Sequence, residues 1–393
     1  MNHQDQQSYS ICIVTQQLGK ILSGIGLHAK NLVAHLVNDG HRVWVIAPID
    51  QRPGEMLGYR FIGVPNPLFS KSQARWISLS LSFRSALINL HQKIQFDIVH
   101  FTDLRESLFC QSGLRMIGNA NDTYAAKIEP LTYYRRHYTD WLLRWLYYLF
   151  VHSCEKASVK RLVAVMANSQ YTANVIQKQY LPDASRIFVV YKSIEPDAFR
   201  DARELRNKLK KHSPVVLFIG GNMQRKGLPD LISAAPKILQ GAPDTEFWVV
   251  GNDDAVPRMR SLCRDLGVEQ HFRFLGRKSQ SELAEIYAQS DIFCMPSLTE
   301  AFGVVFLEAM SAGVPVIGSR TGGIVEIIQN EVNGLLVNPG DHQELTQKVL
   351  RLLKDTNLRE RLRNEGLETV KHFTVDKMMA ETYQVYRTVI EKG

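Results

Sequence analysis

The chain has 393 residues, of which 22% are charged and 45% are hydrophobic. This composition excludes a disordered, collagen-like or low-complexity protein, and the length predicts two domains of about 200 residues each. No apolar stretch reaches the roughly 18 uncharged residues of a membrane-spanning helix, and the polar N-terminus lacks the pattern of a signal peptide. The five cysteines are scattered, without a CxxC pair. We therefore expect a cytoplasmic protein with neither disulfides nor a zinc site.

The net charge of +8 lies in the first half of the chain. Residues 1–190 contain 20 basic and 12 acidic residues, and the remainder contains 27 of each. Such an asymmetry bears on partners rather than on fold. Nucleic acid, an anionic membrane surface or a phosphorylated substrate would suit it, and a basic surface without a partner is the alternative.

Short apolar runs alternate with helical patterns along the first half. The expected strands cover 10–15, 42–47, 96–101, 162–168 and 187–190. A helical pattern at 28–38 is followed by Gly40, which is a typical residue at the end of a helix.

The second half repeats this alternation. Its expected strands cover 214–220, 246–251, 272–275, 291–295, 314–319 and 335–337. Its expected helices lie near 227–240, 255–266, 279–289, 304–312, 322–329, 341–354, 358–371 and 374–390. Continuous apolar strands separated by helices predict the α/β fold class, with parallel sheets covered on both faces. A polar, charged stretch at 191–213 separates the halves, so we expect domains over 1–195 and 196–373.

The segment 296–308 (PSLTEAFGVVFLE) carries the clearest chemical signal. A strand ends before it, and a helix begins near Gly303, with Glu300 before the helix and Glu308 inside it. Backbone N–H groups at a helix N-terminus bind anions, and carboxylates accept hydrogen bonds from hydroxyl groups. The segment therefore predicts a site for a sugar nucleotide. An ordinary helix N-terminus with nearby acidic residues is the alternative.

Other polar segments also follow strands of the second half. After the strand ending near Gly220, Gly221 leads into a loop with Arg225 and Lys226, which are suited to a pyrophosphate. Arg277 follows another strand, where it could meet the base of a nucleotide. Weaker signals are Gly251–Asp254 and the glycines of Ser319–Gly323. Ligands of open α/β sheets bind at such strand ends, although solvated charged loops would look the same.

Together, these segments resemble the donor domain of retaining nucleotide-sugar glycosyltransferases of family 4, with the GT-B fold. The likeness rests on Glu300–Glu308, on LFIGGNMQRKG at 217–227, on FRFLGR at 272–277 and on 308–337. It implies two Rossmann-like domains facing each other across a cleft, with the acceptor bound by the first and the donor by the second. It also implies that the last helix, at about 374–393, packs back on the first domain.

The resemblance implies roles for individual residues. Glu308 would bind the ribose hydroxyls, and Glu300 would contact the donor sugar or its pyrophosphate. Arg225 and Lys226 would neutralise the leaving diphosphate, and Gly221 would allow the donor to approach closely. The donor site is completed by Arg277, Phe302, Gly303, Val304 and Val305, the last three through their N–H groups.

In the first half, Gly24 and Gly26 resemble a dinucleotide-binding fingerprint, and Asp50 ends the next strand. The eight residues between strand and first glycine are too many for an NAD enzyme. In the family that this chain resembles, the loop at this position approaches the phosphate and the sugar of the donor. His100 ends a strand and is a candidate catalytic residue, with a structural histidine as the alternative.

The acceptor side departs from the family pattern. Asp103, Asn121 and Asp122 stand where that family usually carries further histidines, and they are candidate acceptor-binding residues. The departure concerns the acceptor and leaves the donor site unaffected.

The segment 131–161 is unusual because it combines eight aromatic residues with six Lys or Arg and two acids. This pattern fits an interfacial helix on the inner face of an anionic membrane, and a core helix with snorkelling cations is the alternative. Nucleic acid is not an expected partner, because no recognised nucleic-acid module is present.

The expected reaction is transfer of a hexosyl group, with retention, from a nucleotide-diphospho sugar to a hydroxyl acceptor such as a lipid or glycan precursor. UDP is favoured by its frequency in the family. No Asp-x-Asp motif is present, so neither a metal nor another cofactor is expected. A nucleotide-sugar epimerase and a membrane-associated scaffold without turnover are the alternatives.

Overall fold

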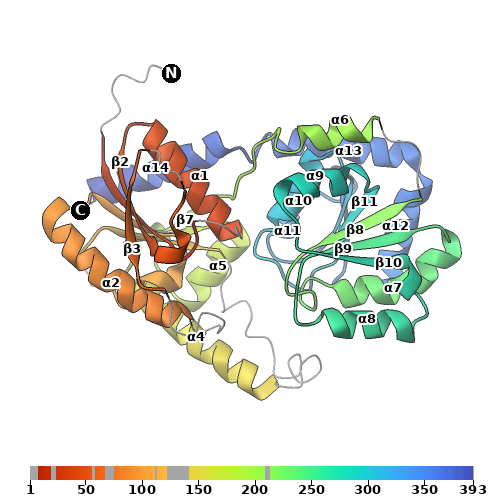
Figure 1. Cartoon of the computed structure of the whole chain (residues 1–393), viewed down its shortest axis with the longest axis horizontal. Helices are drawn as coiled ribbons and strands as arrows, with labels where there is room; N and C mark the ends of the chain where they lie inside the picture. Colours follow the sequence, from red (N-terminus) through yellow and green to blue (C-terminus); the bar gives the residue numbers. More distant parts are fainter. Residues whose placement is uncertain are drawn as a thin grey trace. The chain divides into compact units, whose positions relative to one another are not determined.

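The computed structural model describes residues 8–18, 24–54, 58–66, 75–110, 113–121, 141–208 and 213–392. The chain divides into two compact units (Figure 1). Unit 1 is Met1–Lys192 together with Val375–Gly393, and unit 2 is Ser193–Thr374. The C-terminal helix therefore belongs to the same unit as the N-terminal half of the chain.

Unit 1 contains a seven-stranded parallel sheet in the order β3-β2-β1-β4-β5-β6-β7. Its strands are β1 (Ser10–Val14), β2 (Arg42–Pro48), β3 (Arg60–Val64), β4 (Ile98–Phe101), β5 (Met116–Ala120), β6 (Ala164–Ala167) and β7 (Ile187–Val189). Its α-helices are α1 (Gly24–Asn38), α2 (Arg75–Ile94), α4 (Trp141–Arg161), α5 (Gln170–Gln179) and α14 (Val375–Glu391). Short 3-10 helices are η1 (Ile49–Gln51), η2 (Leu104–Ser107) and η4 (Ala184–Arg186).

Alternate residues of β1 pack on opposite faces of this sheet, as the strand period of two requires. Ile11 and Ile13 join a core with α1 and α14. Cys12 and Val14 join a second core with α2, α5 and the end of α4. Both faces are therefore covered, which explains why most residues of the strands are apolar.

Unit 2 contains a six-stranded parallel sheet in the order β10-β9-β8-β11-β12-β13. Its strands are β8 (Val215–Ile219), β9 (Glu246–Val250), β10 (Phe272–Gly276), β11 (Ile292–Met295), β12 (Val316–Ser319) and β13 (Leu335–Val337). Its helices are α6 (Arg200–Arg206), α7 (Leu228–Gly241), α8 (Val256–Asp265), η5 (Glu269–His271), α9 (Gln280–Ala288), α10 (Val304–Ser311), α11 (Ile324–Ile327), α12 (His342–Lys354) and α13 (Thr356–Val370). Helices α7 and α8 cover one face, and α9 and α10 cover the other (Figure 1).

The predicted α/β class with doubly wound parallel sheets is confirmed. The sequence analysis missed β3, β5, α2 and α5 in unit 1. The missed strand β5 has the sequence MIGNA, whose glycine and asparagine weaken the β pattern. The expected start of the first helix was wrong: α1 begins at Gly24 rather than residue 28, so Gly24 and Gly26 lie in its first turn.

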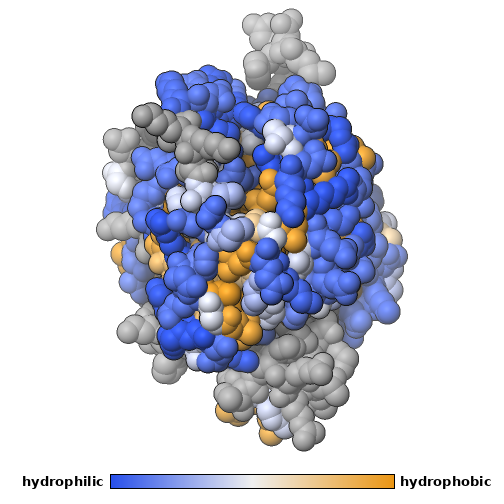
Figure 2. Space-filling view, turned by 90° about the vertical axis from the view of Figure 1, so that its right-hand side faces the viewer, coloured by the Kyte–Doolittle hydropathy of each residue, from blue (hydrophilic) through white to orange (hydrophobic). Residues whose placement is uncertain are grey.

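One face of the molecule illustrates how polar and apolar residues are distributed on the surface. Figure 2 shows a mostly hydrophilic face on which hydrophobic residues form a limited band. Scattered apolar surface is ordinary in soluble domains and carries no assignment by itself.

Three loops at the carboxyl edge of the unit 2 sheet pack backbone against backbone. A Cβ atom on Gly227 would overlap the carbonyl oxygen of Pro296, and one on Gly322 would overlap that of Glu300. Both glycines also have positive φ angles, of 79° and 55°. Only glycine fits these two positions, which join the loops after β8, β11 and β12.

We predict that Gly227→Ala destabilises unit 2 by at least about 2 kcal/mol more than Gly340→Ala. Gly340 has nearly the same φ, 77°, but a Cβ there meets nothing within 4 Å. Comparing the two variants separates the cost of the close contact from the cost of placing alanine at a positive φ. Thermal unfolding would measure both variants, and equal losses would refute the close-contact explanation.

Candidate functional site

The candidate site in unit 2 lies where the strand order reverses. The strands β8 and β11 are neighbours, but the strand that follows β8 lies on one side of the pair and the strand that follows β11 lies on the other. Open α/β sheets bind ligands at such a reversal of strand order. The loop after β8 carries Arg225 and Lys226, and the loop after β11 carries Glu300.

These three side chains come together. Lys226 Nζ lies 2.8 Å from Glu300 Oε2, and Arg225 Nη1 lies 3.8 Å from the same oxygen. Arg225 also donates a hydrogen bond of 2.7 Å to the carbonyl oxygen of Thr299. Each of the three is at most 15% exposed. Two cations therefore face one carboxylate at a poorly solvated strand end.

The backbone of the loop after β8 is positioned by its neighbours. A Cβ at Gly220 would lie 2.5 Å from Cδ of Lys226, so the lysine stem passes directly over this glycine. Met223 N donates to Asp253 Oδ2 at 2.6 Å, which ties the loop to the one after β9. Gly221, by contrast, is exposed, with open space around it. The loop thus combines a fixed lysine with an accessible backbone.

Helix α10 begins beside this pair. Gly303 precedes it with φ of 99°, and the first helical residues Val304 and Val305 are half-buried. Glu308, one turn on, accepts a hydrogen bond of 3.2 Å from the hydroxyl of Tyr287. Burial raises the pKa of the Glu308 carboxyl, and Tyr287 and Lys226 oppose that rise. The sequence analysis missed Tyr287, which lies inside helix α9 and looks there like an ordinary core residue.

Two predicted donor residues have different surroundings. Phe302 is buried and packs edge-on against Phe373, with ring centroids 5.7 Å apart. The side chain of Phe302 therefore supports the loop from within, and only its backbone is suited to a ligand. Arg277 follows β10 and is exposed.

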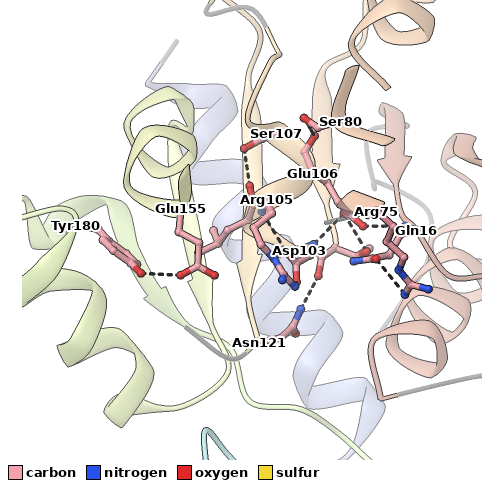
Figure 3. Close-up of polar contacts among 12 residues, drawn as sticks. Gln16, Arg75, Ser80, Asp103, Arg105, Glu106, Ser107, Asn121, Glu155 and Tyr180 are labelled. Carbon is pink, nitrogen blue, oxygen red and sulfur yellow. Dashed lines mark hydrogen bonds and ion pairs between the residues drawn. The ribbon is translucent and has the colours of Figure 1, made fainter. Parts of the chain in front are cut away.

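The corresponding edge of unit 1 contains a buried polar network (Figure 3). Glu106 is 1% exposed and accepts hydrogen bonds from the N–H groups of Gln16 and Asp103 and from the hydroxyl of Thr102. Burial, followed by the neighbouring Asp103, raises the pKa of Glu106 well above its usual range. This residue connects the ends of β1 and β4, where the strand order of unit 1 reverses.

The predicted acceptor residues lie around this network. Asp103 forms a two-pronged ion pair with Arg105, with both distances 2.8 Å. Asn121 donates to the carbonyl oxygen of Thr102 at 2.6 Å, while its own Oδ1 is buried and has no hydrogen-bond partner among the described residues. Asp122 lies outside the described residues.

His100 lies in the core of unit 1. It has no exposed surface, and its Nδ1 and Nε2 are bonded to the Tyr386 hydroxyl at 2.6 Å and to Asn119 Oδ1 at 2.9 Å. Asn119 continues the chain of contacts to His28 Nε2 at 2.7 Å. Burial lowers the pKa of His100 to about 4, so it is neutral at pH 7. In this conformation His100 cannot touch a substrate, and it instead joins β4 to α14.

Lys192 is the main residue that the sequence analysis overlooked. It follows β7 and is 8% exposed, and among the described residues its ammonium group has no hydrogen-bond partner. Burial lowers its pKa to about 7, with Asp103 opposing the shift. A charged residue shortly after an apolar strand was the available signal, whereas Asp103 was predicted from its place in the family pattern.

No group of three or more His, Cys, Asp or Glu side chains within the described ranges is arranged to hold a metal ion. Arg225 and Lys226 of unit 2 are suited to meet a diphosphate by their charge.

Family models match both halves of the chain. A model of the group 1 glycosyl transferases matches residues 201–369, and a model of glycosyltransferase family 4 matches residues 22–198. An uncharacterized glycosyltransferase of Methanocaldococcus jannaschii is 26% identical over 386 residues, covering 95% of this chain and 96% of that protein.

Solved structures share the fold. Sucrose-phosphate synthase from Thermosynechococcus elongatus has a TM-score of 0.81 at 20% identity, covering 98% of this chain and all of that one. The Anabaena protein HepE, in complex with UDP and glucose, has a TM-score of 0.72 at 20% identity, covering 96% and 99%.

We predict that Lys192→Met stabilises the protein near pH 7 and that this gain shrinks toward pH 10. The folded-state pKa of Lys192 is about 7, below the ordinary 10.5. Between these values the unfolded chain holds more protons, so wild-type stability rises with pH by an amount on the order of 3 kcal/mol. Melting temperatures across this range would test it, with the exposed Lys178→Met as control. A gain that is independent of pH would contradict the assignment.

Proposed function

Since the chain belongs to the group 1 glycosyltransferases of the GT-B fold, we propose that it transfers a hexosyl group from UDP-sugar to a hydroxyl acceptor with retention. The observation that carries this proposal is the cluster of Arg225, Lys226 and Glu300 at the strand-order reversal of unit 2. The UDP in the HepE complex supports UDP as the nucleotide. Family membership favours transfer over the epimerase and scaffold alternatives.

The chemistry follows from the charges. As the bond from the sugar C1 to the diphosphate breaks, negative charge develops on the departing phosphate oxygens. Arg225 and Lys226 oppose that charge, together with the N–H groups at Gly303, Val304 and Val305. In the proposed mechanism, these groups stabilise the departing diphosphate without a divalent metal.

Retention is proposed to occur by substitution on the same face of the sugar. The acceptor oxygen bonds to C1 on the side that the diphosphate leaves, and the acceptor proton passes to a phosphate oxygen. Glu300 is held by Lys226 at 2.8 Å, so in the proposal it orients the cation and the sugar rather than attacking C1. Glu308 accepts hydrogen bonds from the ribose hydroxyls.

Unit 1 is proposed to supply the acceptor side. Its candidates are Asp103 and Asn121, to which the structure adds Lys192 beside Asp103. Asp122 remains a candidate on sequence grounds. Gly24 and Gly26, in the first turn of α1, are proposed to approach the donor phosphate.

Helix α4 is proposed to lie on an anionic membrane surface. Nine of its first ten residues are apolar or aromatic, yet none of the ten is buried. Leu142, Leu143, Leu146 and Phe150 are between 48% and 71% exposed and share one side of the helix. Arg144 and the basic end of the helix would attract anionic lipid.

Within the described residues, no helix combines the length and the apolar composition that crossing a bilayer requires. Residues 131–140 of the predicted interfacial segment lie outside the described ranges.

We predict that UDP-glucose raises the melting temperature more than GDP- or ADP-glucose and that Glu308→Gln abolishes the shift. A ligand at a hundred times its dissociation constant stabilises a protein by about 2.7 kcal/mol. Glu285→Gln, an exposed residue on α9, should leave the shift intact. If UDP-glucose shifted the melting temperature of the wild type, Glu308→Gln and Glu285→Gln alike, Glu308 would not belong to the donor site.

Lys226→Gln should lower kcat by about 100-fold or more, because a charge-stabilising group acts mainly in the transition state. Lys237→Gln, an exposed lysine on α7, is the matched control. Steady-state donor turnover would measure both variants, and near-normal kcat for Lys226→Gln would rule out the assigned role. Proton NMR of the first sugar product would show whether the anomeric configuration is retained.

Replacing Leu143 and Leu146 together by Glu should weaken binding to vesicles of anionic lipid by about tenfold or more, since apolar area buried in the interface is lost. Leu81→Glu, an exposed leucine on α2, should have little effect. Vesicle co-sedimentation would measure this, and equal binding of all three proteins would contradict the membrane proposal.

A further inference from the structure

A cavity of about 880 Å³ opens at the opposite edge of the unit 1 sheet from the acceptor candidates. Its lining comes from residues just before β4, β5, β6 and β7 and from the last turns of α2 and α4. These are the amino ends of the strands. The strands are three to five residues long, so the two edges are separated by about 10–17 Å of sheet.

The lining is strongly basic. It contains Arg115, Lys160, Arg161 and Arg186, and His91 adds a titratable ring. In the part of the chain that the structure describes, none of these four cations forms an ion pair. The lining includes one carboxylate, that of Asp97, and it accepts a hydrogen bond of 2.7 Å from Ser10 N.

Helix ends explain part of this charge. Arg161 donates to the carbonyl oxygen of Ala157 at 2.7 Å, and Arg186 donates to that of Leu162. Such bonds complement the partial negative charge at the end of α4. They do not explain Arg115, whose Nε is buried and has no hydrogen-bond partner within the described part of the chain. Nor do they explain Lys160, which makes no hydrogen bond to a described residue.

The remaining wall is partly apolar, and Gln92 and Gln95 also contribute to it. Phe96 is buried behind the cavity, and Leu114, Leu162 and Val163 line it beside the cations. The volume falls within the range of about 300–1,000 Å³ that small-molecule sites occupy. A basic rim over an apolar wall suits a phosphate group attached to an organic body, because guanidinium groups bind phosphate with paired hydrogen bonds.

We propose that this cavity is a binding site for an organic phosphate, separate from the donor site of unit 2. The phosphate would contact Arg115 and Lys160, and the organic part would lie against the wall around Phe96. Ligands that react bind at the carboxyl edge of such sheets. The ligand at the amino edge is therefore an effector or an anchor, either a soluble phosphorylated metabolite or the headgroup of a phospholipid.

The test uses the full chain with Arg115→Gln and Lys160→Gln combined. Its control combines Lys30→Gln and Lys178→Gln, two exposed lysines of unit 1 that remove the same charge without lining the cavity. Both proteins also carry Lys226→Gln, so that phosphate bound at the donor site does not contribute. Circular dichroism and melting curves would establish that both are folded, and Arg115→Lys serves as a milder second variant.

Two probes distinguish the sources of the phosphate. Calorimetry measures binding of sn-glycerol 3-phosphate, and co-sedimentation measures binding to vesicles of phosphatidic acid in phosphatidylcholine. The cavity variant should bind sn-glycerol 3-phosphate (first arm), the vesicles (second arm) or both about tenfold or more weakly than the control. This is the effect expected when charge-assisted contacts to a phosphate are lost. Loss in the first arm identifies a soluble ligand, and loss in the second arm alone identifies a headgroup. Equal binding by the cavity variant and control in both arms, or no binding in either, would overturn the proposal.

Discussion

The close packing of three loop backbones is the constraint on which the site in unit 2 depends. The loops after β8, β11 and β12 touch at positions where no side chain fits, notably Gly227 and Gly322. Backbone hydrogen bonds join the same loops, from Leu298 N to the Arg225 oxygen and from Gly323 N to the Glu300 oxygen, both 2.9 Å. Lys226 and Glu300, 74 residues apart, meet because these contacts leave the loops little freedom. Charged side chains that are held in place beforehand need to move little when charge develops on a bound ligand.

The two units use one topology to build different electrostatic environments. Both sheets reverse strand order at their first strand, and both collect polar residues there. In unit 2, two cations exceed one carboxylate, which suits a diphosphate. In unit 1, Asp103 is paired with Arg105, and burial favours the neutral forms of Glu106 and Lys192. Such an edge attracts anions less strongly and offers hydrogen bonds, which agrees with a hydroxyl acceptor.

Among the described residues, the basic charge of the first half is therefore not concentrated at the carboxyl edge of its sheet. Part of it lies at the amino edge, where α2 and α4 end and their partial negative charges attract cations. Another part lies along α4, whose first half exposes apolar residues. A parallel sheet keeps its two edges apart, so a group bound at the amino edge need not interfere with chemistry at the carboxyl edge.

The amino-acid sequence by itself determined the fold class, the α-helices of unit 2 except α6, and the positions of Arg225, Lys226, Glu300 and Glu308 after their strands. These features depend on local periodicity and on turn residues, which a short window of sequence contains. Tertiary structure decided the rest: that Lys226 pairs with Glu300, that Tyr287 bonds to Glu308, that His100 is enclosed against α14, and that Lys192 is buried. Each of these is a contact or a desolvation between segments far apart in the chain, and no local pattern encodes which distant side chain will share the same space.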